Sequence, residues 1–363
     1  MPRKKILGAG PAGLTAAITL ARADYEVDVY EIRKDSGAKF CGDLHGVENW
    51  TLKKDFCVEL ADVGLQINFD CDPFDQVTIT NGKENVDLKF AAPMFYIVKR
   101  GTFPGTLDQG LKAQALEAGV RLHFGQSPAP EEVDLVATGP IKKEIFALEK
   151  GIIFKTDLPD TCIGLVNDHA ALRGYAYLLV TKGYGCICTV LFDHFKSVSQ
   201  CFDETMEIIE KQVDLKIRDV VHAGGTGSFS THNSYTEGGR LYAGEAAGVQ
   251  DLLWGFGVRN VITSGYLAAR SIIEGADYAE LSRRTFAGKL QASVVNRYLW
   301  EKLAFSNYTP LLKLLRLSQR CQGLMRHDLH DIMRFIHRYG PIHRVFMPLA
   351  LARIRRRYPQ LRI

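Results

Sequence analysis

The chain has 363 residues, of which 46% are hydrophobic and 24% charged, so it can bury a large core and is expected to form two interleaved domains. Its first residues have none of the features of a secretory signal, and no uncharged apolar run approaches the ~18 residues that span a bilayer. The net charge of +4 is uneven, because residues 286–363 carry +12 and the residues before them carry −8.

The eight cysteines show no disulfide framework, which favours a reducing compartment and predicts a cytoplasmic protein. The basic segment 286–363 points to an anionic partner, such as a phospholipid surface, an acidic protein or nucleic acid. Nucleic acid is disfavoured, because neither aromatic interleaving nor a known motif accompanies the charge. A solvated basic helical cap on the body explains the same charge equally well.

Short strands and helices alternate along the first part of the chain, which predicts an α/β fold. Asn81-Gly82 between two alternating segments is typical of a β-hairpin. The expected elements, in order, are strand 4–7, helix 11–23, strand 27–31, loop 32–48, strands 77–80 and 86–90, strand 94–98, helix 103–118 and strand 133–137.

The second part contains another hairpin, a helix and a short buried strand, and becomes all-helical after residue 277. The expected elements are strands 175–180 and 186–192, helix 199–213, strand 241–243 and helix 258–273, with Pro310, Pro341 and Pro348 as later helix breaks. The expected domains are a Rossmann-like FAD-binding domain (1–70, 101–160 and 221–276), an antiparallel-sheet substrate domain (71–100 and 161–220) and a helical basic C-terminal region (277–363).

The first glycine motif, Gly8-Ala9-Gly10-Pro11-Ala12-Gly13, lies between the first strand and the first helix. Its first glycine permits a tight turn, its second lets backbone approach a pyrophosphate, and its third lets the helix pack close to the strand. Glu31 ends the next strand, where an acid accepts ribose hydroxyls and repels a 2′-phosphate. The motif predicts a dinucleotide site; an ordinary glycine-rich turn is the alternative.

No second motif of this kind occurs between a strand and a helix, because Gly224-Gly225-Thr226-Gly227 lacks the spacing. We therefore expect no dedicated nicotinamide domain. Reducing equivalents are expected from a transient electron donor, either NAD(P)H or a ferredoxin-like protein.

The second glycine motif is Gly244-Glu245-Ala246-Ala247-Gly248, followed by Gly255-Phe256-Gly257 and an apolar helix. Glu245 is expected to bond the ribityl hydroxyls of a flavin, while Gly255 and Gly257 let backbone lie against the ring. The dipole of the helix would stabilise the reduced, anionic ring. With the first motif, this predicts one extended FAD held at both ends; a structural helix with a glycine-rich entry is the alternative.

These motifs and several others resemble the geranylgeranyl reductase family, part of a larger group of flavoproteins resembling p-hydroxybenzoate hydroxylase. The resemblance covers residues 4–275, and the Cys41-Gly42-Asp43 loop and the 174–192 hairpin narrow it to the reductase branch. The further matches are Glu31 with Arg33, Lys99-Arg100, Ala137-Thr138-Gly139, Gly174-Tyr175-Ala176-Tyr177, Gly183-Tyr184-Gly185 and Ser264-Gly265.

The resemblance implies FAD binding and saturation of isolated carbon–carbon double bonds in polyprenyl chains or related lipids. It implies that Cys41 lies nearest the isoalloxazine, shaping or protonating the site, and that Arg100 reaches the FAD. A cysteine without chemistry and a solvated arginine are the alternatives. The expected cofactor-binding residues are Gly8, Gly10, Pro11, Ala12, Gly13, Glu31, Arg33, Cys41, Gly42, Arg100, Thr138, Gly139, Gly244, Glu245, Gly255 and Gly257.

The chain departs from the family pattern at three places. Glu245 stands where the family usually has Asp, and Leu252 where it usually has Pro. The family's Tyr-x-Trp-x-Phe-Pro signature, which lines the lipid pocket, is degenerate here as Tyr175-Ala176-Tyr177-Leu178-Leu179-Val180. Glu245 would make the ribityl contact with a longer arm, and the three departures leave the FAD expectation in place.

The expected reaction delivers a hydride from reduced FAD to one alkene carbon and a proton, from water or a nearby acid, to the other. An unactivated alkene offers no oxyanion to stabilise, so positioning in a dry apolar pocket must supply most of the catalysis. The expected pocket residues are Tyr175, Tyr177, Leu179 and Trp254, each of which also fits an ordinary core position.

Two other functions remain open. One is a flavin-dependent monooxygenase of an aromatic or apolar small molecule, either a hydroxylase or a halogenase, although the halogenase signature Trp-x-Trp-x-Ile-Pro is absent. The other is a flavin-binding protein without turnover, whose basic tail would be its working surface.

No metal site is predicted. Cys186 and Cys188 share a strand face without further paired ligands, and the set His327, Asp328, His330 and Asp331 fits a solvated helix face better than a site. In the tail, Lys313, Arg316 and Arg320 lie opposite leucines, and the apolar run 346–352 precedes a cluster of arginines. Such helices can lie at an anionic membrane interface, which predicts peripheral attachment to the inner face of a membrane; packing onto the body is the alternative.

Overall fold

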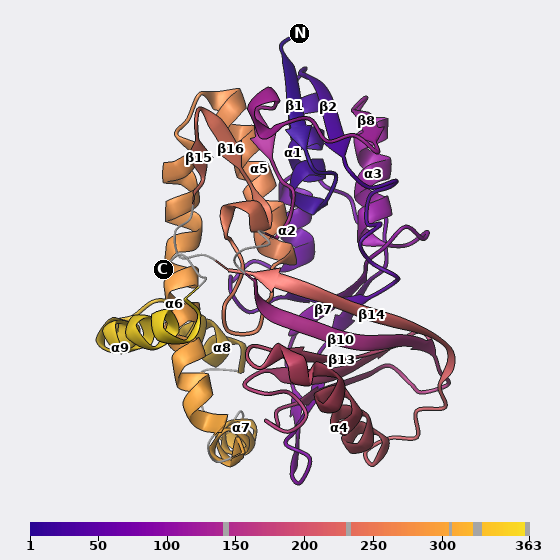
Figure 1. The fold of residues 1–363 in the computed structure, drawn as a ribbon, viewed down its shortest axis with the longest axis vertical. Coiled ribbons are helices and arrows are strands. Elements are labelled where there is room, and N and C mark those ends of the chain that lie inside the picture. The colour runs from indigo at the N-terminus through magenta and orange to yellow at the C-terminus, as the bar shows by residue number, and fades with distance from the viewer. Residues whose placement is uncertain (141–144, 230–233, 305–306, 322–328, 360–363) are drawn as a thin grey trace.

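The computed structural model describes residues 1–140, 145–229, 234–304, 307–321 and 329–359. The described residues form three sheets, named here the parallel sheet, the antiparallel sheet and the small sheet. Helices pack beside the parallel sheet, and further helices run from it past the antiparallel sheet (Figure 1). None of the helices in the described ranges is both long enough and apolar enough to cross a membrane.

The parallel sheet begins with the chain and is completed by strands from distant segments. Its core strands are apolar and buried, as is typical of strands covered by helices. Its strand order is β15 (Thr236–Glu237), β16 (Arg240–Tyr242), β9 (Leu135–Val136), β1 (Arg3–Leu7), β2 (Glu26–Glu31) and β8 (Arg121–Phe124), of which β15 alone among these pairs antiparallel. Its helices are α1 (Pro11–Ala21), α2 (Phe56–Asp62), α3 (Leu107–Glu117) and α5 (Val258–Glu274).

The antiparallel sheet is built mostly of neighbouring strands that fold back on one another. Its order is β14 (Arg218–Ser228), β10 (Ile145–Lys155), β13 (Tyr184–Leu191), β12 (Tyr175–Thr181), β11 (Thr161–Leu165), β5 (Gln76–Thr80) and β6 (Asn85–Lys89). Only β11 and β5 of these pair in parallel, and α4 (Val198–Glu210) packs on this sheet. The small sheet joins β3 (Leu44–Glu48), β7 (Phe95–Lys99) and β4 (Cys71–Phe74).

The expected fold class, a Rossmann-like domain interleaved with an antiparallel sheet and followed by helices, is confirmed. The helices after residue 277 are α6 (Tyr278–Leu303), α7 (Thr309–Cys321), α8 (Leu329–His337) and α9 (Pro341–Arg357). Pro310 and Pro341 lie in first turns, but the expected break at Pro348 is wrong, because α9 continues through it.

Three other expectations need correction. Residues 44–48, expected within a loop, form β3, which pairs along its length with β7. Strand β10 was not expected, and it pairs with β13 and β14 inside the antiparallel sheet, although range 101–160 was assigned to the FAD-binding domain. Strand β14 likewise extends that sheet into range 221–276. The positions at which the chain passes from one sheet to another therefore differ from the expected domain boundaries.

Candidate active site

The turn from β1 into α1 is shaped by glycines for which a larger residue has no room. Gly8 has φ of +109°, and a Cβ there would lie 2.3 Å from the carbonyl oxygen of Ala137 in the strand β9 segment. A Cβ on Gly13 would lie 1.9 Å from the carbonyl oxygen of Gly8. These two glycines therefore allow helix α1 to pack closely against strand β1, which is the structural role of glycine in this motif.

Gly10, in contrast, faces open space. No described atom would come within 4 Å of a Cβ at Gly10, and the same holds for Gly139 opposite the turn. Gly10, Pro11 and Ala12 line a large cavity, and α1 begins there without a side-chain cap among the described residues and without an acid in its first turn. Unbonded N–H groups at the start of a helix favour an anion, so this cradle fits a pyrophosphate.

Glu31 lies beside the cradle at the end of β2. Its carboxylate accepts hydrogen bonds from the Ala9 amide at 3.0 Å and from the Arg33 amide at 2.9 Å. Both Glu31 and Arg33 line the cavity. The two amide bonds fix the orientation of the carboxylate and leave it acceptor sites for ribose hydroxyls.

The second glycine motif meets the first directly. A Cβ on Gly265 of α5 would lie 2.1 Å from the carbonyl oxygen of Ala12, and one on Gly244 would lie 3.0 Å from the Ala12 Cβ. The Gly244 amide also donates to Ser264 Oγ in α5 at 3.1 Å. Helices α1 and α5 therefore cross in contact, which places both motifs on one cavity.

The loop before α5 presents backbone to this cavity. The Gln250 side chain donates to the Gly255 carbonyl at 2.5 Å, and a Cβ on Gly257 would lie 2.2 Å from Gln250 Oε1. Gly257 is the N-cap of α5 and has no side-chain cap among the described residues. The amide of Leu252, which the proline usual at this position would lack, donates to Ser293 Oγ at 3.2 Å.

Glu245 and Arg100 line the cavity but already have partners. The Ser228 amide donates to Glu245 at 3.2 Å, and burial raises the pKa of this carboxyl. Arg100 is buried and donates two 2.8 Å hydrogen bonds to Asp108, while its guanidinium lies 4.3 Å from the centre of the Phe40 ring. Arg100 is therefore neither a solvated arginine nor a free cation, and Asp108 neutralises it at the cavity wall.

Cys41 and Gly42 are placed differently from the other predicted residues. Cys41 is exposed and lies outside the cavity lining in the described structure, whereas its neighbour Phe40 lines the cavity, and the proximity of Cys41 to a bound ring stays a prediction. Its amide donates to Asp43 at 2.8 Å. Gly42 has φ of +109°, and a Cβ there would lie 2.1 Å from the Tyr184 hydroxyl. This tight turn directs Cys41 outward.

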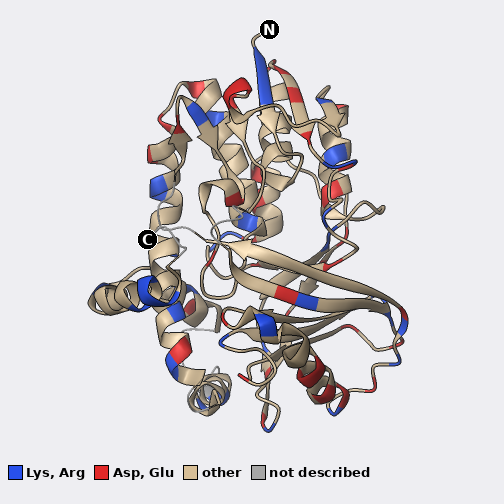
Figure 2. Cartoon of the chain, viewed as in Figure 1, with Lys and Arg blue, Asp and Glu red and all other residues tan. Residues whose placement is uncertain are grey.

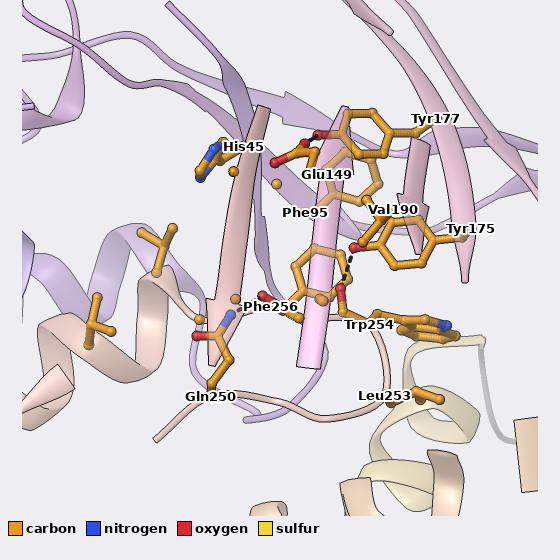
Figure 3. Close-up of a pocket in the computed structure, with 18 of the residues that line it drawn as sticks. His45, Phe95, Glu149, Tyr175, Tyr177, Val190, Gln250, Leu253, Trp254 and Phe256 are labelled. Carbon is orange, nitrogen blue, oxygen red and sulfur yellow. Dashed lines mark hydrogen bonds between the residues drawn. The ribbon is translucent and has the colours of Figure 1, made fainter. Parts of the chain in front are cut away.

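Apart from Gly8 and Gly13, which shape the turn behind it, the remaining predicted residues line a cavity of about 1200 Å³. The cavity extends from the cradle, past Thr138 and Gly139, along one face of the antiparallel sheet. All four expected pocket residues line it. Figure 3 labels three of them, Tyr175, Tyr177 and Trp254, and shows the hydrogen bond that the Tyr175 hydroxyl donates to the Trp254 carbonyl. These four residues are Tyr175, Tyr177, Leu179 and Trp254.

Two polar residues that line the cavity were not predicted from the sequence. The Tyr177 hydroxyl donates to Glu149 on β10 at 2.6 Å, and burial raises the pKa of Glu149 (Figure 3). His45 on β3 also lines the cavity, and burial together with Arg100 lowers its pKa to about 3, so its ring is neutral. Both residues lie on strands that were not expected. The one feature of the sequence that could have revealed either of them is an acid, Glu149, in the middle of the apolar segment 145–155.

The far end of the cavity is walled by the C-terminal helices. Its walls there are apolar, and its lining residues include Trp300 and Leu303 of α6, Leu311 and Leu315 of α7, and Leu329, Ile332 and Met333 of α8. The described part of the C-terminal region thus packs on the body, which was one of the two alternatives for the tail.

No group of three or more His, Cys, Asp or Glu side chains within the described ranges is placed to hold a metal ion. His327 and Asp328 lie outside those ranges. His330 contacts the Pro93 carbonyl, and Asp331 pairs with Arg334. Cys186 Sγ and Cys188 Sγ lie 3.4 Å apart inside the antiparallel sheet.

Comparison with known proteins places this fold among flavoproteins. Residues 6–77 match the family described as NAD(P)-binding Rossmann-like domain, while no curated protein matches the sequence. A geranylgeranyl bacteriochlorophyll reductase-like protein from Thermoplasma acidophilum is 18% identical with a TM-score of 0.65, over 99% of this chain and 97% of that one.

Two enzymes that use other chemistry are similar to the same degree. The flavin-dependent brominase Bmp2 is 15% identical with a TM-score of 0.66, over 98% of this chain and 99% of its own. A 2-methyl-3-hydroxypyridine-5-carboxylic acid oxygenase is 15% identical with a TM-score of 0.57, over 92% and 98%. At these identities the comparisons establish the fold, that of flavin-dependent oxidoreductases, and FAD is the cofactor that they support.

Proposed function

We propose that this chain binds one FAD in extended form and reduces isolated carbon–carbon double bonds of a polyprenyl or related lipid. The observation that carries the proposal is the single cavity of about 1200 Å³, which begins at the anion cradle and continues between apolar walls to α7 and α8. A cavity of this shape offers room for both a dinucleotide and a long apolar chain beside it.

The residues present fit FAD along its length. Gly10, Pro11 and Ala12 would hold the pyrophosphate, and Glu31 the adenosine ribose. The start of α5 would face the pyrimidine edge of the ring, where the helix dipole favours negative charge. When bound and reduced, FAD supplies the hydride, and we expect NAD(P)H or a ferredoxin-like protein as the transient electron donor.

The proton for the second alkene carbon has a source in the cavity wall. Tyr177 points into the cavity with its hydroxyl bonded to Glu149 (Figure 3). Burial raises the pKa of both groups, so each holds its proton more tightly than in water. Tyr177 Oη would turn from Glu149 to release its proton to carbon as the hydride adds to the other carbon, and would then regain a proton from water. His45, neutral in this setting, adds no competing positive charge.

The cavity walls perform the positioning that an unactivated alkene requires. Trp254 contacts the rings of Trp50, Phe256 and Trp300 edge-on, with centroids 5.7 to 6.4 Å apart. This aromatic cluster lines the cavity between the cradle end and the helical end and makes its wall there apolar. Positioning in a dry site is the main contribution that such a wall can make to the rate.

Anaerobic single turnover tests the proposal. The FAD-loaded protein, chemically reduced and then freed of reductant, is mixed with polyprenyl lipids of different head groups without oxygen. The proposal predicts reoxidation of the flavin in step with a product that has gained two hydrogens. Failure of every lipid to reoxidise the flavin contradicts the reductase function. Substrate oxygenation or halogenation that appears only on admitting oxygen instead supports the monooxygenase alternative.

A further inference from the structure

Helices α8 and α9 carry an unusually apolar outer surface. Four of their large apolar side chains are more than half exposed: Phe335 (66%), Ile342 (53%), Val345 (71%) and Leu349 (55%). We call these four residues the α8–α9 patch. Singly exposed apolar residues are ordinary, but a contiguous group marks a surface that contacts something apolar.

The α9 part of the patch forms a stripe along the helix. Ile342, Val345 and Leu349 are spaced three and four residues apart and therefore share one face. Continuing the same spacing reaches Arg353 and Arg356, both exposed. The stripe is thus apolar in its first half and cationic in its second half.

The adjoining face of α9 anchors the helix to the body. His343, Ala350 and Ile354 are buried, and Arg357 pairs with Asp193 at 3.2 Å and with Glu301 of α6. Because these contacts fix the rotation of α9, the stripe is held outward and cannot turn inward to bury its side chains. Figure 1 shows α9 at the edge of the molecule, crossing α6 and away from the parallel sheet.

Apart from Asp331 on α8, which pairs with Arg334, the charge around the patch is positive. No acidic residue follows Asp331 in the sequence. Arg338 and Arg344 are exposed beside the patch, and no described acid lies within ion-pair distance of either of them or of Arg356. Figure 2 shows the opposite distribution on α4, where acidic residues gather. An apolar patch within a cationic border is complementary to the surface of a bilayer that contains anionic lipids.

The patch also reaches the rim of the cavity. Phe335 and Ile342 are exposed to solvent and at the same time line the cavity, as do Arg338 and Pro341 between them. A chain leaving a bilayer at this patch would pass from one apolar surface directly to another.

From this arrangement we infer that the α8–α9 patch docks the protein on an anionic bilayer, with the cavity rim at the lipid surface. The docking needs no flavin chemistry; it rests on the proposed function only in that a lipid would be what enters the cavity.

Vesicle flotation tests the docking with the full-length protein. The vesicles contain phosphatidylcholine, either alone or with a third of the lipid replaced by phosphatidylglycerol. The test variant is Val345→Glu/Leu349→Glu, which lies outside the cavity lining. The control is Leu116→Glu on α3, since Leu116 is exposed by 51% and lies on another helix. Circular dichroism and gel filtration check the fold and oligomeric state of every variant.

We expect the wild type and Leu116→Glu to float with the anionic vesicles, and the double variant to bind at least tenfold more weakly. We also expect binding to fall with salt and to be weaker on phosphatidylcholine alone. Three results would overturn the inference: no flotation of the wild type, equal flotation of the double variant, or a patch that pairs two copies in solution and is released by the double substitution. Each can be read whether or not the protein reduces any lipid.

Discussion

Gly10 and Gly13 belong to the same turn, yet the structure gives them different tasks. Gly10 is extended, with φ of −86°, and faces the cavity, so Gly10→Val fits the fold. A valine there would occupy the space of the pyrophosphate. We expect the affinity for FAD to fall at least tenfold, about 1.4 kcal/mol, while the free energy of unfolding of the apoprotein changes by less than about 1 kcal/mol.

The comparison variant is Gly13→Ala, whose Cβ would lie 1.9 Å from the Gly8 carbonyl oxygen. It should lower the stability of the apoprotein as well as cofactor binding. Titration with FAD and urea denaturation measure the two quantities separately. Unchanged FAD affinity in Gly10→Val would show that the pyrophosphate lies elsewhere.

Glu48 gives a prediction for pH. It is 2% exposed, its Oε2 has no hydrogen-bond partner among the described residues, and burial raises its pKa from 4.5 to about 7, an effect that Lys289 and Arg259 only partly offset. The folded state therefore binds this proton more tightly than the unfolded state, and stability is lost as the pH rises from about 5 through 7.

Glu48→Gln removes that proton exchange. We expect the variant to match the wild type near pH 5 and to be more stable at pH 8, by about 2 to 3 kcal/mol. Urea denaturation at both pH values checks this. A variant that is less stable than the wild type at pH 8 would show that the charged carboxylate is favourably paired there.

Some site residues could be predicted from the residues next to them in the sequence, and others could not. Glycines of the cradle were predicted because a turn between strand and helix constrains them locally. Glu149 was not predicted, because its place at the cavity depends on pairing of β10 with β13, which is distant in sequence. Cys41 was expected at the cavity, but the turn at Gly42, packed against Tyr184, directs it to solvent. Arg100 lines the cavity, its contact with FAD stays a prediction, and its ion pair with Asp108 was not predicted.

At the scale of elements, the contact between α1 and α5 places the two glycine motifs on one cavity. Gly265 allows the two helices to touch, and even an alanine there would meet the Ala12 carbonyl at 2.1 Å. We expect Gly265→Ala to destabilise the protein by about 3 kcal/mol and to weaken FAD binding, because the helices must separate.

Gly288 on α6 supplies the matched control. The nearest described atom to a Cβ at Gly288 would be 3.9 Å away, so Gly288→Ala should stabilise the protein by about 0.5 to 1 kcal/mol through helix propensity alone. Chemical denaturation of both variants measures the two changes in the free energy of unfolding. A neutral Gly265→Ala would mean that the helices do not cross in contact.

Elements with strong local patterns were predicted well, and elements defined by pairing were not. The hairpins at 76–89 and 175–191 carry turn signals between alternating segments and lie where expected. Strand β14 was missed because its glycines suggest a loop; a Cβ on Gly224 would lie 2.8 Å from the Glu149 carbonyl oxygen, so the strand needs glycine for close pairing. Helix α9 continues through Pro348 because its packing on α6 compensates for the lost hydrogen bond.

At the scale of the whole molecule, Glu301 joins the C-terminal helices to the body. Its carboxylate, 7% exposed, pairs with Arg357 of α9 and lies within 3.9 Å of Arg173, Arg297 and Arg353. Three basic residues of the tail, Arg297, Arg353 and Arg357, thus pair within the protein. Glu301→Gln would leave the buried Arg297 uncompensated, and we expect a loss of about 3 kcal/mol.

The matched control is Glu274→Gln, which breaks an exposed pair with Arg270 and should change stability by less than about 1 kcal/mol. Thermal and urea denaturation of both variants measure the difference. Equal effects would mean that Glu301 is not the joint between the tail and the body.

The architecture as a whole followed from two glycine motifs far apart in the sequence, since one extended ligand must touch both. The points where the chain crosses between sheets could not be derived, because strand pairing between distant segments has no local signature. The role of the C-terminal helices as a cavity wall also depends on tertiary packing, as Trp300 and Leu329 show.

Calorimetric titration of the apoprotein with FAD and with FMN tests the central claim most directly. The structure predicts one FAD per chain and binding at least tenfold weaker for FMN, because FMN has no adenosine diphosphate half to occupy the Gly8–Gly13 cradle and Glu31. A folded protein that takes up no FAD, or that binds FMN equally well, would contradict it.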